Sequence, residues 1–575
     1  MVDIVKKIEE LTEKKQHVLT LPPKEAERYI VKSPEGAAIV HSLAEQDFYF
    51  LVNEIGAEDS LELLSMATDS QWEHIFDMEA WQKETVDTGA VIRWFELMQK
   101  VDAGRFIRWI TSEKKDFLEL FLYYHVEAGF REEDQDPSEF PDDFFTFDDL
   151  FYLRLVRLQN VANPADEEVS AYRNQVLYDF MKRVAEEDHP LFREILYYSA
   201  AVLPAEAEEE LYRLRNVRLA EKGFLPFDEA IGIYQPVADL RHLAKKKKIA
   251  YVPGATMPVP LLQTAVLDET RPFSEALAHL DSAEVLRGLQ MELAALCNRI
   301  AVADQAGIKG KQSLKPLVRK ACGYIELGLG RLAGGDPQEN PDPASAAAVL
   351  NNHFLVDIFR AGYSRAIAVK RRADSWYRES WFNRCQLPVS FWGEEYQAIL
   401  SGLLVKRPLF FDPEKPEGYR DFESPADLQK AADALDHVMA LDRLLNQAGF
   451  DPSPVSFDIL TYKNLLLTRW ARDCLGLPPV VDFIEINDFR PFFADLMTAP
   501  SGEAKTAVTA FGKIADYWRE LFLDWLAVVT GISSYEISQA AGRVLEDLFA
   551  EIEDSLGRVS PPELSPRYVD LFLVS

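Results

Sequence analysis

The sequence predicts an all-α protein in which α-solenoid-like helical repeats near the N-terminus are followed by helical bundle domains. Apolar residues recur at three- and four-residue intervals, as in Val91, Trp94, Phe95 and Met98, and this is the spacing of one buried helix face. Alternating runs of strand length are scarce. Hydrophobic residues make up 48% of the 575 residues, which is enough for several packed cores and predicts three or four domains of about 150 residues.

The first part of the chain predicts short helices. Residues 1–35 are expected to form a charged amphipathic helix and a linker, without the apolar core that a signal sequence contains. Residues 36–130 are predicted to be short helices joined by turns at 55–59 and 101–104. A short helix cannot bury its apolar face alone, so these helices are expected to stack as a helical-repeat domain.

An acidic segment, residues 131–149, interrupts the helical pattern. It contains nine carboxylates and two prolines. The like charges repel one another and the prolines remove backbone donors. We therefore expect an acidic loop that is mobile and dispensable for folding.

The later boundaries follow from proline- and glycine-rich stretches, which stop helices. Residues 150–243 are predicted to be a helical extension, 244–262 a linker, 263–406 a central helical domain, 407–424 a second linker and 425–575 a C-terminal helical domain. The central domain is expected to contain one long apolar helix from about Ala344 to Arg372.

The charge and the cysteines of the chain limit its partners and compartment. Lys and Arg number 62 against 94 Asp and Glu, a net charge of −32, so nucleic acid and anionic membranes would meet a repulsive field. The longest apolar stretch, 521–532, is interrupted by Asp524 and is too short to span a bilayer. The four cysteines lie far apart, which argues against a disulfide framework and against a cysteine zinc site. We therefore expect an acidic, soluble, cytoplasmic protein that neither binds nucleic acid nor inserts into a membrane.

Motifs for cofactors and metals fail on spacing. The glycines of 307–313 are too close together for a phosphate loop, and the dinucleotide-like pattern of 328–333 follows a predicted helix instead of a strand. We expect 307–313 to be a loop between helices and the small residues of 328–333 to serve close helix packing. The nine histidines are scattered singly, so no metal site and no cofactor is predicted. Along 206–218, glutamates and arginines are spaced as ion pairs on a solvated helix face.

One group of polar residues is the candidate ligand-binding site. In a continuous helix from Ala344 to Arg372, about 100° per residue places five polar side chains on one narrow stripe of an otherwise apolar surface, namely His353, Asp357, Arg360, Ser364 and Arg371. Two interpretations are open. Either the stripe touches solvent or closes a structural network, or it lines a pocket in which Arg360 holds an anion. Gly362, on the opposite side, would let a neighbouring backbone approach closely.

Several short motifs carry a resemblance that covers nearly the whole chain. They are Gly56-Ala57-Glu58-Asp59, Leu63-Leu64, Gln71, Asp77, Trp81, Arg213 to Leu219, Gly223-Phe224, Tyr234, Phe359 to Tyr363 and Arg567 to Leu571. In these residues the sequence resembles an uncharacterised bacterial protein family of unknown function, which implies no activity. The first motifs are also loosely similar to the helical superhelix in the cytosolic N-terminal domain of one class of magnesium transporters, which implies a solenoid in that region.

The sequence leaves several classes of function open, and it does not decide whether the protein is an enzyme. The leading hypothesis is a scaffold or adaptor that binds other proteins, because solenoids offer long concave surfaces and acidic, aromatic segments suit protein partners. The alternative is an enzyme or a sensor that binds a small anionic ligand near Arg360. A weaker alternative is a regulator that responds to divalent cations through the acidic segment. The partner and the oligomeric state stay open.

Overall fold

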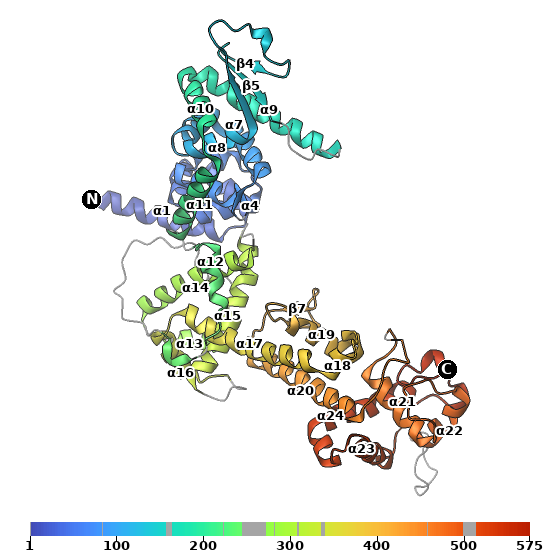
Figure 1. Ribbon diagram of the computed structural model, residues 1–575. Coiled ribbons are helices and arrows are strands. Elements are labelled where there is room, and N and C mark those ends of the chain that lie inside the picture. The colour runs from blue at the N-terminus through green and yellow to red at the C-terminus, as the bar shows by residue number, and fades with distance from the viewer. Residues whose placement is uncertain are drawn as a thin grey trace. The chain divides into compact units, whose positions relative to one another are not determined.

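The computed structural model of the chain (Figure 1) describes residues 2–82, 84–156, 164–221, 224–237, 239–243, 272–280, 282–306, 310–334, 340–456, 458–497 and 513–575. It is 71% helical, with 24 helices and a few short strands. This composition confirms the predicted all-α class. The predicted linker at 244–262 lies outside the described residues.

Two compact units share the chain. Unit 1 comprises Met1–Tyr234, Lys246–Ser274 and Leu280–Ala321, and unit 2 comprises Gln235–Lys245, Glu275–His279 and Cys322–Ser575. Two helices, α13 (Pro272–Ala278) and α15 (Lys311–Ala333), contribute residues to both units. The units are therefore not two successive halves of the sequence.

The described elements of unit 1 are mostly helices, with five short strands among them. In chain order they are α1 (Val2–Thr20), α2 (Pro23–Lys32), α3 (Gly36–Ser42), α4 (Glu45–Ile55), α5 (Leu61–Met66), α6 (Asp69–Glu79), β1 (Trp81–Gln82), β2 (Thr85–Val86), α7 (Thr88–Ser112), α8 (Lys115–His125), β3 (Val126–Phe130), η1 (Pro137–Glu139), β4 (Phe145–Thr146), β5 (Phe151–Leu155), α9 (Pro164–Glu187), α10 (His189–Ala201), α11 (Pro204–Glu221), α12 (Phe227–Ala230), η2 (Ile231–Tyr234) and α14 (Ala283–Asp304). In the region predicted as helical repeats, helices contact the next but one: α3 with α5, α4 with α6 and α5 with α7. The repeat itself stays a prediction.

Local signals explain where these helices begin and end. Gly56 ends α4 with φ 108°, a backbone conformation that favours glycine. Asp102 is non-helical inside α7 (φ −162°, ψ 95°), and its carboxylate accepts a hydrogen bond from the Arg105 N–H at 2.9 Å, as an N-cap does. Thr68 and Gln71 form a capping box at the start of α6. Both turns predicted from the sequence are therefore present.

A small antiparallel sheet flanks the acidic segment. Its strand order is β3-β5-β4, and β3 pairs with β5 from Val126↔Leu155 to Phe130↔Phe151. Phe140, inside the acidic segment, stacks on Tyr152 of β5 with ring centroids 4.0 Å apart. The sequence predicts a helix at residues 151–155, but four of these five residues are aromatic or aliphatic and lie opposite β3, which favours the strand. The acidic segment is thus a loop that carries strand β4 and contacts the sheet.

Unit 2 is also mainly helical. Its described elements are η3 (Leu240–His242), α16 (Pro343–Asn352), α17 (Leu355–Glu379), α18 (Trp381–Arg384), η5 (Val389–Trp392), α19 (Gly393–Leu404), β6 (Phe410–Phe411), β7 (Tyr419–Arg420), α20 (Pro425–Ala448), α21 (Tyr462–Cys474), α22 (Ile486–Leu496), α23 (Asp516–Thr530), α24 (Ser534–Leu556), η6 (Pro561–Glu563) and η7 (Pro566–Tyr568). The predicted linker at 407–424 contains the two-stranded sheet of β6 and β7. Helix α17 packs on α19 and α20.

Glycines bring α17 against the second half of α15. A Cβ atom on Gly362 would lie 1.9 Å from the Tyr324 carbonyl oxygen, and one on Gly328 would lie 1.9 Å from the Ile358 carbonyl oxygen. No larger residue fits at either place without moving a backbone. The close approach predicted for these small residues is therefore present.

The long helix predicted from Ala344 to Arg372 is wrong. The chain leaves the helix at His353 (φ −128°, ψ 148°) and Phe354 (φ −70°, ψ 144°), and α17 starts anew at Leu355. The residues before the break, Asn351 and Asn352, are poor helix formers. Apolar periodicity continues across the break, and this continuity is why the pattern predicted one helix.

Candidate functional site

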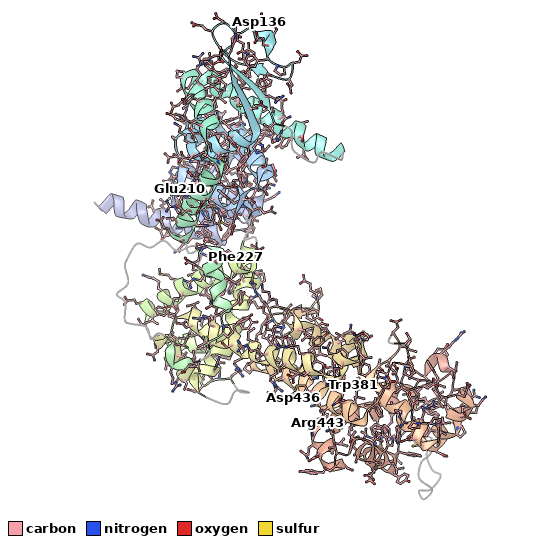
Figure 2. All side chains as sticks on the ribbon, in the orientation of Figure 1. Asp136, Glu210, Phe227, Trp381, Asp436 and Arg443 are labelled. Atoms are coloured by element: carbon pink, nitrogen blue, oxygen red, sulfur yellow. The ribbon has the colours of Figure 1, made fainter. Side chains whose placement is uncertain are left out.

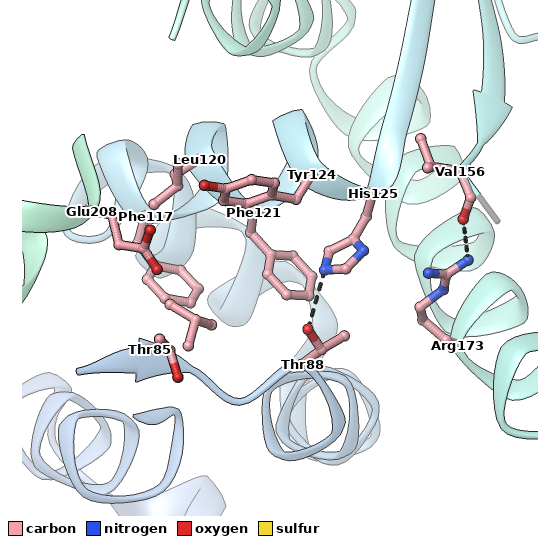
Figure 3. Close-up of a pocket in the computed structure, with 11 residues that line it drawn as sticks. Thr85, Thr88, Phe117, Leu120, Phe121, Tyr124, His125, Val156, Arg173 and Glu208 are labelled. Carbon is pink, nitrogen blue, oxygen red and sulfur yellow. Dashed lines mark hydrogen bonds between the residues drawn. The ribbon is translucent and has the colours of Figure 1, made fainter. Parts of the chain in front are cut away.

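A cavity of about 340 Å³ lies in unit 1, lined by residues of β2, α7, α8, α9 and α11 and by Val156 (Figure 3). Its middle is apolar. Phe117, Leu120 and Phe121, on the same face of α8, line it, and Val156 lines the cavity beside Arg173. Polar side chains lie toward its two ends, and they decide what the cavity can hold.

Arg173, on α9, is a buried cation whose described neighbours include no carboxylate. It is 3% exposed. Its Nη2 donates to the Val156 carbonyl at 2.6 Å and to Asn174 Oδ1 at 2.7 Å, and both acceptors are neutral. Its Nη1 is buried and donates no hydrogen bond. Burial lowers the pKa of Arg173, which has no counter-ion among the described residues.

His125, the last residue of α8, faces Arg173 (Figure 3). Burial, with a further contribution from the Arg173 charge, lowers the pKa of His125 to about 4. The imidazole is therefore neutral at pH 7. Its Nε2 lies 3.4 Å from the Thr88 hydroxyl, while its Nδ1 is buried without a hydrogen bond. When Thr88 donates to Nε2, the proton of the ring is on Nδ1, which can then donate to a ligand.

The backbone of Val156 forms hydrogen bonds with both His125 and Arg173 and holds them near each other. The N–H of Val156, one residue past β5, donates to the His125 carbonyl at 3.0 Å, and the Val156 carbonyl accepts from Arg173. Thr88 is held at the start of α7 because Asp87 caps that helix by accepting from the Ala90 N–H at 3.0 Å. The small sheet and two helix ends thus position the polar end of the cavity.

The opposite end of the cavity is acidic. Glu208, on α11, lines it together with Tyr124 (Figure 3). Burial, and then the Glu208 carboxylate, raise the pKa of Tyr124. Glu208 forms no ion pair with any described residue, whereas Glu210, two residues further along α11 and exposed (Figure 2), pairs with Arg213 at 2.6 Å.

The five residues predicted as a ligand-binding stripe do not line this cavity. Arg360 Nε donates to the Gln235 carbonyl at 3.2 Å, and Arg360 Nη1 lies 3.5 Å from Asp357 Oδ1. Ser364 Oγ accepts from the Val237 N–H at 2.8 Å. Arg360 and Ser364 therefore hold residues 235–237 on α17.

The other two residues of the stripe lie apart from these contacts. Arg371 is exposed further along α17, and His353 lies in the break before the helix. The helical stripe does not include His353, because the predicted helix is interrupted there.

A buried ion network joins motifs that the sequence keeps far apart. Arg218 on α11 donates from Nε and Nη2 to the two carboxylate oxygens of Asp77 on α6, at 2.7 and 2.8 Å. Arg215 donates to the Asp77 carbonyl at 2.7 Å and lies 5.6 Å from the ring centre of Trp81. The solvated face predicted for 206–218 is therefore wrong at these two arginines, although it holds for Arg213. Periodicity along one helix cannot reveal a partner on another.

Metal binding has no geometric support in the described parts of the chain, where no group of three or more His, Cys, Asp or Glu side chains could hold an ion. In the acidic segment, which includes Asp136 (Figure 2), three carboxylates pair with arginines: Asp149 with Arg131, Asp143 with Arg154 and Asp148 with Arg193. None of the described helices is both long and apolar enough to cross a bilayer.

A second cavity, of about 530 Å³, lies in unit 2. It contains the Tyr396 hydroxyl 3.3 Å from His437 Nδ1. Its charged residues, such as Glu395, Lys430 and Arg543, are exposed to solvent. It thus offers no buried charge that a ligand would satisfy, and the cavity of unit 1 is the stronger candidate.

Comparison with known proteins places the chain in one family. A search of curated proteins and a search of solved structures each returned no match. The model of a family of unknown function, DUF6178, matches residues 3–575. The chain therefore belongs to the family of unknown function DUF6178.

Proposed function

We propose that the protein binds a small anionic ligand in the cavity of unit 1, with Arg173 as the anchor. The observation that carries this proposal is the buried guanidinium, which has two neutral acceptors, an Nη1 amino group without an acceptor and no described carboxylate beside it. A buried charge without a counter-ion destabilises a protein by about 3 kcal/mol. A ligand carboxylate or phosphate would supply the missing charge and accept from Nη1.

This proposal keeps the class of the sequence-based alternative, a sensor or enzyme for a small anion, but moves the site from Arg360 to Arg173. Arg360 already donates to a backbone carbonyl and is partly exposed. Arg173 is more deeply buried and lines a cavity large enough for a metabolite. The neutral imidazole of His125 beside it adds a second donor without adding charge.

The test is a thermal-shift and calorimetric screen of the full chain against phosphate, acetate, hexanoate and benzoate at constant ionic strength. We expect at least one anion to raise the unfolding midpoint of the wild type. Arg173→Met should abolish the shift and Arg173→Lys should weaken it, because a lysine lacks the planar fork. Arg183→Lys, on the exposed face of the same helix, is the matched control and should respond like the wild type. Equal responses of the wild type and Arg173→Met would refute the proposal.

A second candidate function is the scaffold or adaptor that the sequence suggested. Four exposed tyrosines favour it, because Tyr123 and Tyr124 on α8 and Tyr197 and Tyr198 on α10 form two edge-to-face pairs on helices that contact each other. Exposed aromatic clusters are common in protein interfaces. One protein should then co-purify in stoichiometric amount, and Tyr197→Ser should release it. Retention of that protein by Tyr197→Ser would count against this surface.

A further inference from the structure

The two ends of the cavity in unit 1 carry opposite charges. Arg173 and His125 lie at one end, and Glu208 lies at the other, beyond Phe117 and Leu120 (Figure 3). A ligand with an anionic group alone would satisfy Arg173 and leave the acidic end unused. The two charged ends therefore indicate a ligand that carries both an anionic and a cationic group.

Glu208 is available to a ligand. It is half-buried, it lines the cavity, and it makes no ion pair with a described residue. An ionised carboxylate has about four acceptor positions. A donor or a cation that entered this end would therefore find free acceptor positions.

The middle of the cavity selects for hydrocarbon. Phe117, Leu120 and Phe121 supply an aromatic and aliphatic wall between the two charged ends. Apolar surface removed from water there contributes roughly 25 cal/mol per Å². A compact polyanion such as inorganic phosphate would gain nothing from this wall.

Resting on the proposed function, we propose that the ligand is dipolar, with a carboxylate bound by Arg173 and His125, an amino group bound by Glu208, and an apolar chain or ring between the two. The carboxylate accepts from Arg173 Nη1 and His125 Nδ1. The ammonium group donates to the Glu208 carboxylate. Each charge of the ligand meets the opposite charge of the protein, so binding leaves no isolated charge in the cavity.

The experiment is isothermal titration of the full chain with four probes: 6-aminohexanoate, hexanoate, hexylamine and 4-aminobutanoate. We expect 6-aminohexanoate to bind at least about tenfold more tightly than hexanoate, which corresponds to about 1.4 kcal/mol for the additional charged contact. Hexylamine, which cannot use Arg173, should bind more weakly still. The shorter 4-aminobutanoate reports whether the spacing between the charges matters, and equal affinity of the two amino acids would contradict two simultaneous contacts.

Variants separate this inference from the proposed function. Glu208→Gln should reduce the affinity for 6-aminohexanoate to that for hexanoate and leave hexanoate binding unchanged, while Glu210→Gln on the same helix should change neither. Arg173→Met should abolish binding of both carboxylates. If hexanoate binds the wild type as tightly as 6-aminohexanoate and Glu208→Gln has no effect, the dipolar ligand is wrong and the anion site stands. If neither carboxylate depends on Arg173, both proposals fail. Hydrogen exchange of α8 and α9 identifies any variant that does not fold.

Discussion

Removal of the Asp77 carboxylate is expected to destabilise unit 1 by about 3 kcal/mol. Asp77 is 3% exposed and accepts two charge-assisted hydrogen bonds from Arg218. Each such bond contributes roughly 1.5 kcal/mol or more. The estimate stays at the lower end of the 3–5 kcal/mol typical of a broken buried pair, because Glu73 remains 3.2 Å from Arg218 and 2.7 Å from the nearby Lys114.

The assay must report on unit 1 alone, since the chain has two compact units. Hydrogen exchange followed by mass spectrometry across a urea series gives the midpoint of unfolding for separate peptides. Asp77→Ala should lower the midpoint for α6 and α11 and leave α20, in unit 2, as an unchanged internal reference. Asp77→Asn should have a smaller effect, because the amide oxygen still accepts one hydrogen bond.

A matched control lies on the same helix α11. Arg213 forms an exposed ion pair with Glu210, and Arg213→Ala should not change the midpoint measurably. The reasoning would be refuted if Asp77→Ala unfolded at the same urea concentration as Arg213→Ala. A double-mutant cycle of Asp77→Ala with Arg218→Ala gives the coupling between the two charges directly.

Three further outcomes follow from the described contacts. The pKa of His125 is about 4 in the folded chain and about 6.5 when unfolded, so only the unfolded state gains a proton between these values. The stability of unit 1 should therefore fall by up to about 3 kcal/mol as the pH drops from 6.5 to 4, and a urea midpoint measured against pH should vary less in His125→Asn. Gly362→Ala should destabilise unit 2 by about 3 kcal/mol or more, because a Cβ would meet the Tyr324 carbonyl. Gly288→Ala on α14 has open space around it and should stabilise its helix by about 1 kcal/mol. Equal effects of the two substitutions on stability would show that the backbones of α15 and α17 can separate. Arg360→Ala should cost only about 1 kcal/mol in chemical denaturation, since its side chain is 30% exposed and its hydrogen bond to a carbonyl is 3.2 Å long.

The fold class could be predicted because the signals for helix formation lie within short stretches of the sequence. Apolar spacing such as Val91, Trp94, Phe95 and Met98 identifies a buried face, and Gly56 and Asp102 mark turns through their own conformations. The strand at 151–155 was missed because its stability comes from pairing with residues 126–130, and pairing partners are not visible in a local pattern.

The candidate site could not be predicted for a related reason. Nothing in the sequence around Arg173 distinguishes it from a surface arginine, because its burial depends on Val156 and on the end of α8 at His125. Arg360, in contrast, lies on an apolar helix, and the polar stripe on that helix is visible in the local sequence pattern. Asp77 and Arg218, which both belong to the motifs of the family resemblance, form an ion pair in the structure. The resemblance thus signals a contact between distant parts of the chain, but not the site at Arg173.

The contacts of residues 235–237 limit where the protein can be divided into fragments that fold. Gln235 and Val237 belong to unit 2 through their hydrogen bonds to Arg360 and Ser364, although the chain then returns to unit 1 for α14. No single truncation point therefore separates the two units. A deletion series that stops anywhere between α12 and α15 would remove the rest of unit 1 or leave α17 without its backbone partner, and loss of function in such fragments would report incomplete folding.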